Sequence, residues 1–355
     1  MNLIDIVSTY SSFGDHHTGT SVDRETSAWL VDLLGDLGAT HREETYEFER
    51  FVGEAELHVD GDPVPSLPVF YSAVGRHICD RVEVVRVPFN RCGTAHGLDD
   101  VLVGRTGGVA VAVDGPDDLA VQCNRVPLNG SRPAVVVPGN WADRVQRGAS
   151  LRFDARLERS ESSNIIAELG APNHSPVTIT TPLTAWTPAA GERGSGLAIA
   201  LALMVELAAA HHVTLVACSG HELDHLGLRR FLAGSDVIAE WVIHLGASVG
   251  AVEPGADGTP ALGRHRYVLT DAPGETRAAI AARVAGANWT LLDLDPWPGE
   301  GGTWRDAGAS VLSFIGQFPY FHTAADIPAH AVTSDTLELA KTVALDAARV
   351  FLAER

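Results

Sequence analysis

Residues 219–225 (SGHELDH) carry the densest group of reactive side chains in this 355-residue sequence. They place the imidazoles of His221 and His225 and the carboxylate of Glu222 directly after an apolar run at residues 213–218, which we interpret as a buried strand. In open α/β sheets, ligand sites lie at the carboxyl ends of such strands. Imidazole and carboxylate groups grouped in this way serve as metal ligands or as proton-transfer groups.

Two interpretations of this segment compete. In the first, HELDH is a zinc-binding H-E-x-x-H helix, because His221 and His225 are four residues apart and would share one helical face. However, the motif directly follows a buried strand, and no third ligand follows at a recognised spacing. In the second interpretation, which we favour, His221 and Glu222 replace a pair of acids in a different metallopeptidase fold. His225 is then a capping or packing residue.

The elements around this segment are those of an α/β protein. Residues 1–45 are expected to be mostly helical, and strands alternate with helices from residue 163 onward. Expected strands are 164–169, 177–181, 213–218, 241–245, 267–270 and 310–314, and expected helices are 194–210, 223–232, 275–284 and 334–353. This alternation predicts a three-layer α/β sandwich with a mixed, mostly parallel central sheet. Residues 299–302 (GEGG) lack the context of a phosphate-binding loop and are expected to form a flexible loop at the site.

Residues 64–160 differ in composition from the segments on either side. Short valine-rich runs at 82–87, 109–113 and 134–137 are separated by Gly, Pro and Asp, a pattern that favours a small β-rich insert. We therefore expect one α/β domain made of residues 1–63 and 161–355, which the insert at 64–160 interrupts.

The order of segments resembles the M28 family of zinc aminopeptidases, whose clan also contains the glutaminyl cyclases. Residues 163–170 (SNIIAELG) are similar to the strand NVIAELPG, and residues 320–326 (YFHTAAD) resemble the YHTPxD segment. Residues 191–196 (GERGSG) fall on G-x-D-N-A-S-G, residues 220–222 (GHE) on G-E-E, and residues 241–245 (WVIHL) on a strand with a metal-binding Asp. The insert is similar to the protease-associated domain that many of these enzymes carry.

The resemblance implies a metal site with an altered ligand set. Glu192, Glu222 and His322 fall on the ligands of the family's second metal, and they suffice for one catalytic zinc per chain with an open position. Pro182 falls on a histidine ligand of the first metal and offers no ligand atom, and His244 falls on its aspartate ligand. A two-zinc site is therefore not expected.

His221 falls on the general base of the family, and we predict it as the catalytic residue. The ordinary pKa of a histidine is about 6.5, so this replacement is compatible with proton transfer near neutral pH. Arg193 places a permanent cation beside Glu192, and we expect it partly to neutralise that carboxylate. His244, Arg193 and His225 are the further residues expected to line the site. The roles open to His244 are orienting His221, binding the metal and contacting a substrate carboxylate.

The composition limits the class of partner. With 45 acidic against 26 basic residues, the formal net charge is −19 at pH 7, so we expect neither nucleic acid nor an anionic membrane as a partner. The sequence has no pattern of a signal peptide and no apolar run of membrane-spanning length, so we expect a cytoplasmic location. Four cysteines without C-x-x-C spacing are expected to stay reduced: Cys79, Cys92, Cys123 and Cys218. The sequence gives no indication of the oligomeric state.

Together these observations predict a metal-dependent, aminopeptidase-like hydrolase that cleaves an amide bond in a small amino-acyl or short peptide-like substrate and uses a single zinc. One alternative is a mono-zinc cyclase or transferase resembling glutaminyl cyclase, in which an amine of the substrate attacks the carbonyl. Another alternative is a catalytically inactive M28-like protein that binds a peptide or small ligand through the same pocket.

Overall fold

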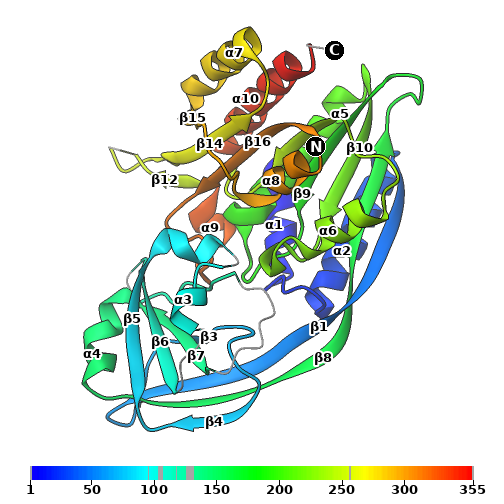
Figure 1. Ribbon diagram of the computed structural model, residues 1–355. Helices are drawn as coiled ribbons and strands as arrows, with labels where there is room; N and C mark the ends of the chain where they lie inside the picture. Colours follow the sequence, from blue (N-terminus) through cyan, green and yellow to red (C-terminus); the bar gives the residue numbers. More distant parts are fainter. Residues whose placement is uncertain are drawn as a thin grey trace.

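A ten-stranded sheet forms the centre of the protein (Figure 1). This computed structural model describes residues 2–94, 96–102, 107–116, 118–124, 132–255 and 257–353. In spatial order the strands are β15 (Trp289–Leu291), β14 (His265–Thr270), β16 (Ser310–Gln317), β11 (Trp241–Leu245), β9 (Ser175–Pro182), β10 (His211–Cys218), β8 (Ser150–Leu169), β1 (Thr40–Val59) and β2 (Asp62–Pro63), with β4 (Gly75–Cys79) paired to β8.

Parallel pairing in the middle of this sheet brings several strand ends together. β9 lies between β10 and β11 and is parallel to both, and β11 is parallel to β16. Antiparallel pairs join β16 to β14, β10 to β8 and β8 to β1. The carboxyl ends of β9, β10 and β11 therefore meet at one edge, which is where a ligand site is expected. The mixed, mostly parallel sheet predicted from the sequence is confirmed.

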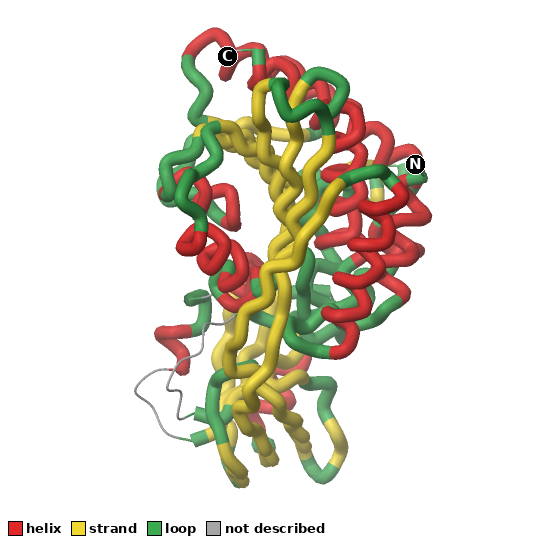
Figure 2. Tube along the Cα trace, turned by 90° about the vertical axis from the view of Figure 1, so that its right-hand side faces the viewer, coloured by secondary structure: helices red, strands yellow, loops and turns green. Residues whose placement is uncertain are grey.

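Helices cover both faces of the sheet, and Figure 2 shows the strands between them. One face packs against α1 (Leu3–Ser12), α2 (Ser21–Asp36), α5 (Ser195–Leu207), α7 (Gly274–Val284) and α10 (Ser334–Leu352), and the other against α6 (Leu226–Gly234) and α8 (Gly299–Asp306). α5 is apolar nearly all round, and a helix of this kind lies in the interior. No helix in the described parts of the chain combines the length and apolar composition needed to cross a membrane.

A separate four-stranded sheet occupies the region expected to be the β-rich insert. Its spatial order is β3 (Leu67–Pro68), β7 (Ala134–Pro138), β6 (Gly108–Asp114) and β5 (Val82–Pro88). The short helices α3 (Asp99–Leu102) and α4 (Ala142–Arg147) belong to this region, whereas the hairpin β12 (Val252–Pro254) and β13 (Pro260–Leu262) and the helix α9 (Pro328–Ala331) follow later in the chain.

The long strands β1 and β8 connect this region to the central sheet. They pair without interruption from Thr40 opposite Glu168 to His58 opposite Ser150, and Figure 1 shows the ribbon running from the central sheet to the strands of the insert. Residue 160 lies inside this ribbon, so β8 runs through the predicted boundary there without interruption. The division into two domains and the likeness to a protease-associated domain stay predictions.

Residues 299–302, expected to form a flexible loop, are the first turn of α8. The glycines allow close packing here: a Cβ on Gly301 would lie 2.6 Å from Ser313 Oγ, and one on Gly302 would lie 2.4 Å from the Trp297 carbonyl oxygen. Trp304 is buried in the same helix and holds it against the sheet. The packing buries Glu300, a residue that the sequence did not single out.

Asn164, on β8, fixes the carboxyl end of β10 against the start of α6. Its Oδ1 accepts a hydrogen bond from Ser219 N (3.2 Å), and its Nδ2 donates one to Gly227 O (2.9 Å). The side chain is buried. Because Ser219 begins the segment that carries His221, this contact positions the candidate site.

Replacing Asn164 by alanine is expected to lower the free energy of unfolding by roughly 1–3 kcal/mol, because the buried Ser219 N–H and Gly227 C=O lose these partners. Urea denaturation followed by circular dichroism measures the change. The matched control is Ser163→Ala at the half-buried neighbour, for which a change within about 0.5 kcal/mol is expected. Equal losses in the two variants would contradict the positioning role of Asn164.

Candidate functional site

The predicted site residues come from four segments at the edge of the sheet. Glu192 and Arg193 lie in a π-helical turn, Ala190–Gly194, directly before α5. His221 and Glu222 lie in a 3-10 helical turn after β10. His244 is on β11, and His322 follows β16 with a left-handed backbone, φ +59°.

A buried ion pair lies at the centre of this group. Glu192 Oε1 is 2.8 Å from Arg193 Nη2 and 3.0 Å from His322 Nε2, and none of the three side chains is more than 1% exposed. Arg193 Nε also donates a hydrogen bond to the Thr184 carbonyl (3.0 Å). The expectation that Arg193 neutralises Glu192 therefore agrees with the geometry.

The surroundings keep Glu192 ionised. Burial alone would raise the pKa of Glu192, but the charges of Arg193 and His322 outweigh burial and hold that pKa below its usual value. Asp326 fixes the turn by accepting hydrogen bonds from Gly191 N (2.6 Å) and Glu192 N (3.0 Å). Burial and the neighbouring Glu192 charge raise the pKa of Asp326 to about 8, against the effect of these bonds.

Glu222 is engaged by hydroxyl groups. Its Oε1 accepts hydrogen bonds from Thr18 Oγ1 (2.5 Å) and Thr18 N (3.1 Å), and its Oε2 accepts one from Thr184 Oγ1 (2.8 Å). Thr184 also accepts a hydrogen bond from Gly220 N (2.7 Å). Glu222 therefore ties the amino-terminal segment to the end of β9, and both of its carboxylate oxygens are occupied.

The three predicted zinc ligands do not converge on one point. Glu192 meets His322, whose Nδ1 donates its proton to the Gln122 carbonyl at 2.9 Å. The contact between His322 Nε2 and the Glu192 carboxylate therefore requires a second proton, which lies between these two atoms. Glu222 faces its threonine partners. Across the described residues, no group of three His, Cys, Asp or Glu side chains is arranged to hold a metal ion. These residues do not fit a catalytic zinc, because the Arg193 guanidinium already supplies the cation beside Glu192.

Glu300, at the start of α8, holds the ring of His221. The Nδ1 atom of His221 is 3.0 Å from Glu300 Oε1. Burial raises the pKa of Glu300 to about 8, with Arg193 opposing and Glu222 adding to the shift. Burial and the charge of Arg193 lower the pKa of His221 well below its usual value. At neutral pH a protonated Glu300 therefore donates to Nδ1, which leaves Nε2–H of neutral His221 as a donor.

His225 joins α6 to α8 and does not belong to a zinc-binding helix. Asp224 and His225 both have left-handed backbones, φ +58° and +59°, so HELDH is not a continuous α-helix. His225 is at the N-cap position of α6, with its Nδ1 2.9 Å from Thr303 Oγ1 and its ring 4.9 Å from that of His221. The interpretation as an H-E-x-x-H helix is therefore wrong, because the backbone does not place both imidazoles on one helical face.

His244 lies at the base of the same group. Its Nδ1 is 2.9 Å from Ser313 Oγ on β16, and the ring is fully buried. Burial lowers the pKa of His244 to about 3, with smaller effects of His225 and Arg193. His244 is therefore neutral at physiological pH, so it cannot attract a substrate carboxylate by charge.

Six buried polar atoms of this group have no hydrogen-bond partner among the described residues, and two of them, Glu192 Oε1 and His322 Nε2, meet in the ion pair. The other four have no ion-pair contact among these residues either: Glu192 Oε2, Arg193 Nη1, His244 Nε2 and Glu300 Oε2. Buried polar atoms in folded proteins are almost always paired with another polar group. The four atoms include a donor, Arg193 Nη1, and carboxyl acceptors. We call these four residues the polar centre.

A small cavity of about 30 Å³ adjoins Glu222. Trp186, Phe70, Phe51 and Tyr71 form aromatic walls, and the Trp186 and Phe70 ring centroids are 4.5 Å apart. Phe70 and Tyr71 come from the region of the predicted insert, whereas Trp186 and Glu222 belong to the α/β part. The cavity therefore needs both parts of the chain.

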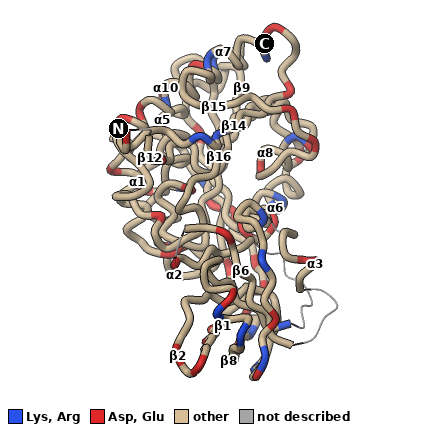
Figure 3. The backbone as a smooth tube through the Cα atoms, turned by 90° about the vertical axis from the view of Figure 1, so that its left-hand side faces the viewer, with Lys and Arg blue, Asp and Glu red and all other residues tan. Residues whose placement is uncertain are grey.

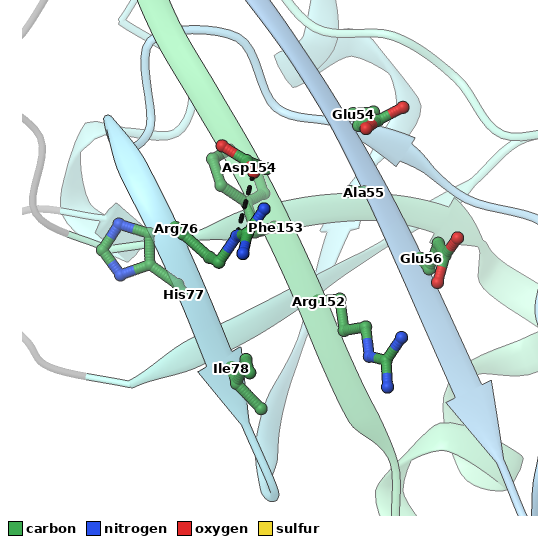
Figure 4. Close-up of a pocket in the computed structure, with 9 residues that line it drawn as sticks. All are labelled: Glu54, Ala55, Glu56, Arg76, His77, Ile78, Arg152, Phe153 and Asp154. Atoms are coloured by element: carbon green, nitrogen blue, oxygen red, sulfur yellow. Dashed lines mark hydrogen bonds and ion pairs between the residues drawn. The ribbon is translucent and has the colours of Figure 1, made fainter.

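A more open groove of about 400 Å³ lies on β1, β4 and β8 (Figure 4). Its side chains carry both signs of charge, and Arg76 forms an ion pair with Asp154 at 3.1 Å. Figure 3 shows acidic and basic residues interspersed along the β1–β8 ribbon. None of the predicted site residues lines this groove, so it is separate from the candidate site.

Comparisons with known proteins identify the fold. No family model matches the sequence, and no curated protein matches it. Several solved structures are similar to the chain. A zinc aminopeptidase from Bacillus subtilis has a TM-score of 0.74 and 16% sequence identity, and the match covers 99% of this chain and 94% of that one. A peptidase M28 precursor from Shewanella amazonensis SB2B has a TM-score of 0.73 and 16% identity, with 99% of this chain and 92% of that one covered; an aminopeptidase from Aneurinibacillus sp. strain AM-1 has a TM-score of 0.64 and 15% identity, with 97% and 92% of the two chains covered. The resemblance to M28 enzymes is thus confirmed at the level of the fold.

Glu300 is expected to make the protein less stable as the pH rises. Its folded pKa of about 8 lies above the ordinary value of 4.5, so the folded state keeps a proton that the unfolded state releases. This contribution is present at acid pH and is lost as the pH rises from 4.5 toward about 8. Between about pH 6 and about pH 8, the wild type should lose roughly 1 kcal/mol per pH unit relative to Glu300→Gln.

Urea denaturation at a series of pH values measures this difference. The matched control is Glu275→Gln. Glu275 is exposed and is the second residue of α7, and Glu300 is the second residue of α8; in both helices the first residue is a glycine. The control should keep the pH dependence of the wild type. If Glu300→Gln also kept the pH dependence of the wild type, Glu300 would not hold a proton in the folded protein, and the prediction would be wrong.

Proposed function

We propose that this chain binds a small amino-acyl or peptide-like molecule at the polar centre, and that it does so without zinc. The proposal matches the alternative of an M28-like ligand-binding protein. The observation that carries it is the Arg193 guanidinium, 2.8 Å from Glu192 and buried with it. A permanent cation on this carboxylate competes with any metal ion for the same charge.

The unpartnered atoms of the polar centre support this class of ligand. An amide group presents an N–H donor and a C=O acceptor, which complement Glu192 Oε2 and Arg193 Nη1. The small aromatic cavity beside Glu222 offers an apolar surface for a group of about the size of a methyl group. Similar solved structures are named as aminopeptidases, and peptide-like ligands agree with that likeness.

The pair formed by His221 and Glu300 favours a second candidate function, amide hydrolysis without metal. The contact of 3.0 Å between His221 Nδ1 and Glu300 Oε1 fixes the ring. With Glu300 ionised, Nδ1 carries the proton and Nε2 becomes a base that can activate water. Because the pKa of Glu300 is about 8, this activity would rise as the pH passes that value.

Zinc content distinguishes the proposal from the zinc hydrolase and the mono-zinc cyclase. Protein purified without chelators is expected to contain much less than one zinc per chain when it is measured by inductively coupled plasma mass spectrometry. Neither EDTA nor zinc chloride should shift its melting temperature.

Replacing Arg193 by methionine should lower the free energy of unfolding by roughly 3–5 kcal/mol, because it leaves the Glu192 charge buried without its partner. Arg193→Lys, which keeps the charge, should cost less. One tightly held zinc per chain, removed by EDTA with a loss of stability, would overturn the proposal.

Ligand binding is tested by isothermal titration calorimetry with a panel of amino acid amides, dipeptides and tripeptides. At least one probe is expected to bind the wild type, and Glu300→Ala should weaken binding by about tenfold or more through loss of a hydrogen bond. Glu275→Ala is the matched control and should bind as the wild type does. Hydrolysis of a fluorogenic aminoacyl amide that persists in EDTA and is lost in His221→Ala would favour the second candidate. Hydrolysis or cyclisation that requires zinc would contradict both.

A further inference from the structure

The segment Gln122–Asn124 connects the region of the predicted insert to the candidate site. Gln122 and His322 exchange two hydrogen bonds: Gln122 N donates to His322 O (2.9 Å), and His322 Nδ1 faces Gln122 O at 2.9 Å. His322 is the residue that contacts Glu192 in the buried ion pair. The backbone of Gln122 therefore sets the orientation of a side chain at the centre of the site.

Asn124, at the other end of the segment, is anchored on two sides. Its backbone N–H donates to Cys92 O (2.9 Å), and its Nδ2 donates to Gly93 O (3.2 Å). Its Oδ1 accepts a hydrogen bond from Trp186 Nε1 (2.8 Å), and Trp186 is a wall of the aromatic cavity. The segment thus touches both the buried ion pair and the cavity.

Cys123, in the middle of the segment, lies against Cys92. The two sulfur atoms are 2.8 Å apart, and both side chains are fully buried. Cys92 belongs to the 3-10 helical turn Phe89–Gly93, which Asn124 also contacts. Neither sulfur is in a disulfide, and the hydrogen bonds of Asn124 to Cys92 and Gly93 hold the two backbones side by side.

We propose that Cys92 and Cys123 form a reversible oxidation site that closes as a disulfide across this segment. The oxidant is a low-molecular-weight disulfide such as oxidised glutathione. The thiolate of one cysteine attacks it, releases one reduced glutathione and forms a mixed disulfide. The second cysteine, as its thiolate, then attacks the protein sulfur and releases the other glutathione. Two protein thiols are oxidised, one glutathione disulfide is reduced, and both thiol protons end on the two glutathione thiols.

Closure would hold the segment in the position that it has here. The cross-link joins residues 92 and 123 and removes conformational freedom from the chain between them. It preserves the hydrogen bond between the Gln122 carbonyl and His322 and that between the Asn124 side chain and Trp186. The cross-link therefore restricts movement of the site through residues of the predicted insert. Because the sulfurs are buried, exchange in the folded protein requires local opening of the segment and is slow. This inference does not depend on which ligand the site binds.

The test begins with reduced full-length protein, freed of reductant and incubated with oxidised glutathione. Unreacted thiols are then blocked with N-ethylmaleimide in denaturant, and the digest is analysed by mass spectrometry. The expected product is a peptide pair that joins Cys92 to Cys123 and is two hydrogen atoms lighter than the two reduced peptides. The internal controls are Cys79, half-buried, and Cys218, buried, which should carry the label. Labelled Cys92 and Cys123, or equal oxidation of Cys79 and Cys218, would overturn the assignment.

Hydrogen exchange tests the coupling to the site. In the oxidised wild type, the amides of Gln122 and Asn124 should exchange at least about tenfold more slowly than in the reduced protein, because the cross-link suppresses local opening. Cys92→Ser should show no such dependence on oxidation, whereas Cys79→Ser, the matched control, should retain it. Unchanged exchange in the cross-linked wild type would refute the coupling.

Discussion

The buried pair of Arg193 and Glu192 is the interaction on which the site depends. Taking two charges out of water is costly, and their mutual attraction offsets this cost when they meet closely and further hydrogen bonds engage their other atoms. In this pair, Glu192 Oε2 and Arg193 Nη1 are left without a partner among the described residues. The Thr184 carbonyl accepts a hydrogen bond from Arg193 Nε, and His322 Nε2 contacts Glu192 Oε1. Asp326 fixes the backbone of the turn through two N–H groups. The positions of β9, α5 and the segment after β16 are therefore tied to one pair of charges.

This pair also sets the chemistry of its neighbours. The positive charge of Arg193 helps to keep His221 and His244 neutral, and burial keeps Glu300 protonated near neutrality. The result is a region of neutral donors and acceptors around one compensated pair of charges. Such a region suits the recognition of a polar, uncharged group. Both carboxylate oxygens of Glu222, which the resemblance made a metal ligand, accept hydrogen bonds from threonine side chains here.

The predicted insert contributes to the site through two contacts. Phe70 and Tyr71 complete the aromatic cavity, and the segment Gln122–Asn124 holds His322 and Trp186. The long ribbon of β1 and β8 carries the insert into this position. A residue far from the ion pair in sequence can therefore alter the geometry of the pair through Gln122.

The sequence alone determined the class of fold, because alternation of apolar strands with helices depends on local periodicity. Residue type and place also pointed to His221 and Glu222, directly after a buried strand, whereas Glu192 and His322 were identified through the resemblance to the M28 family. The tertiary structure decided which of these side chains meet. Whether Glu222 turns to Glu192 or to Thr18 depends on the path of the amino-terminal segment, and burial of Glu300 depends on glycine packing in α8. The partner of a buried charge is fixed by packing across the whole chain, which local sequence does not encode.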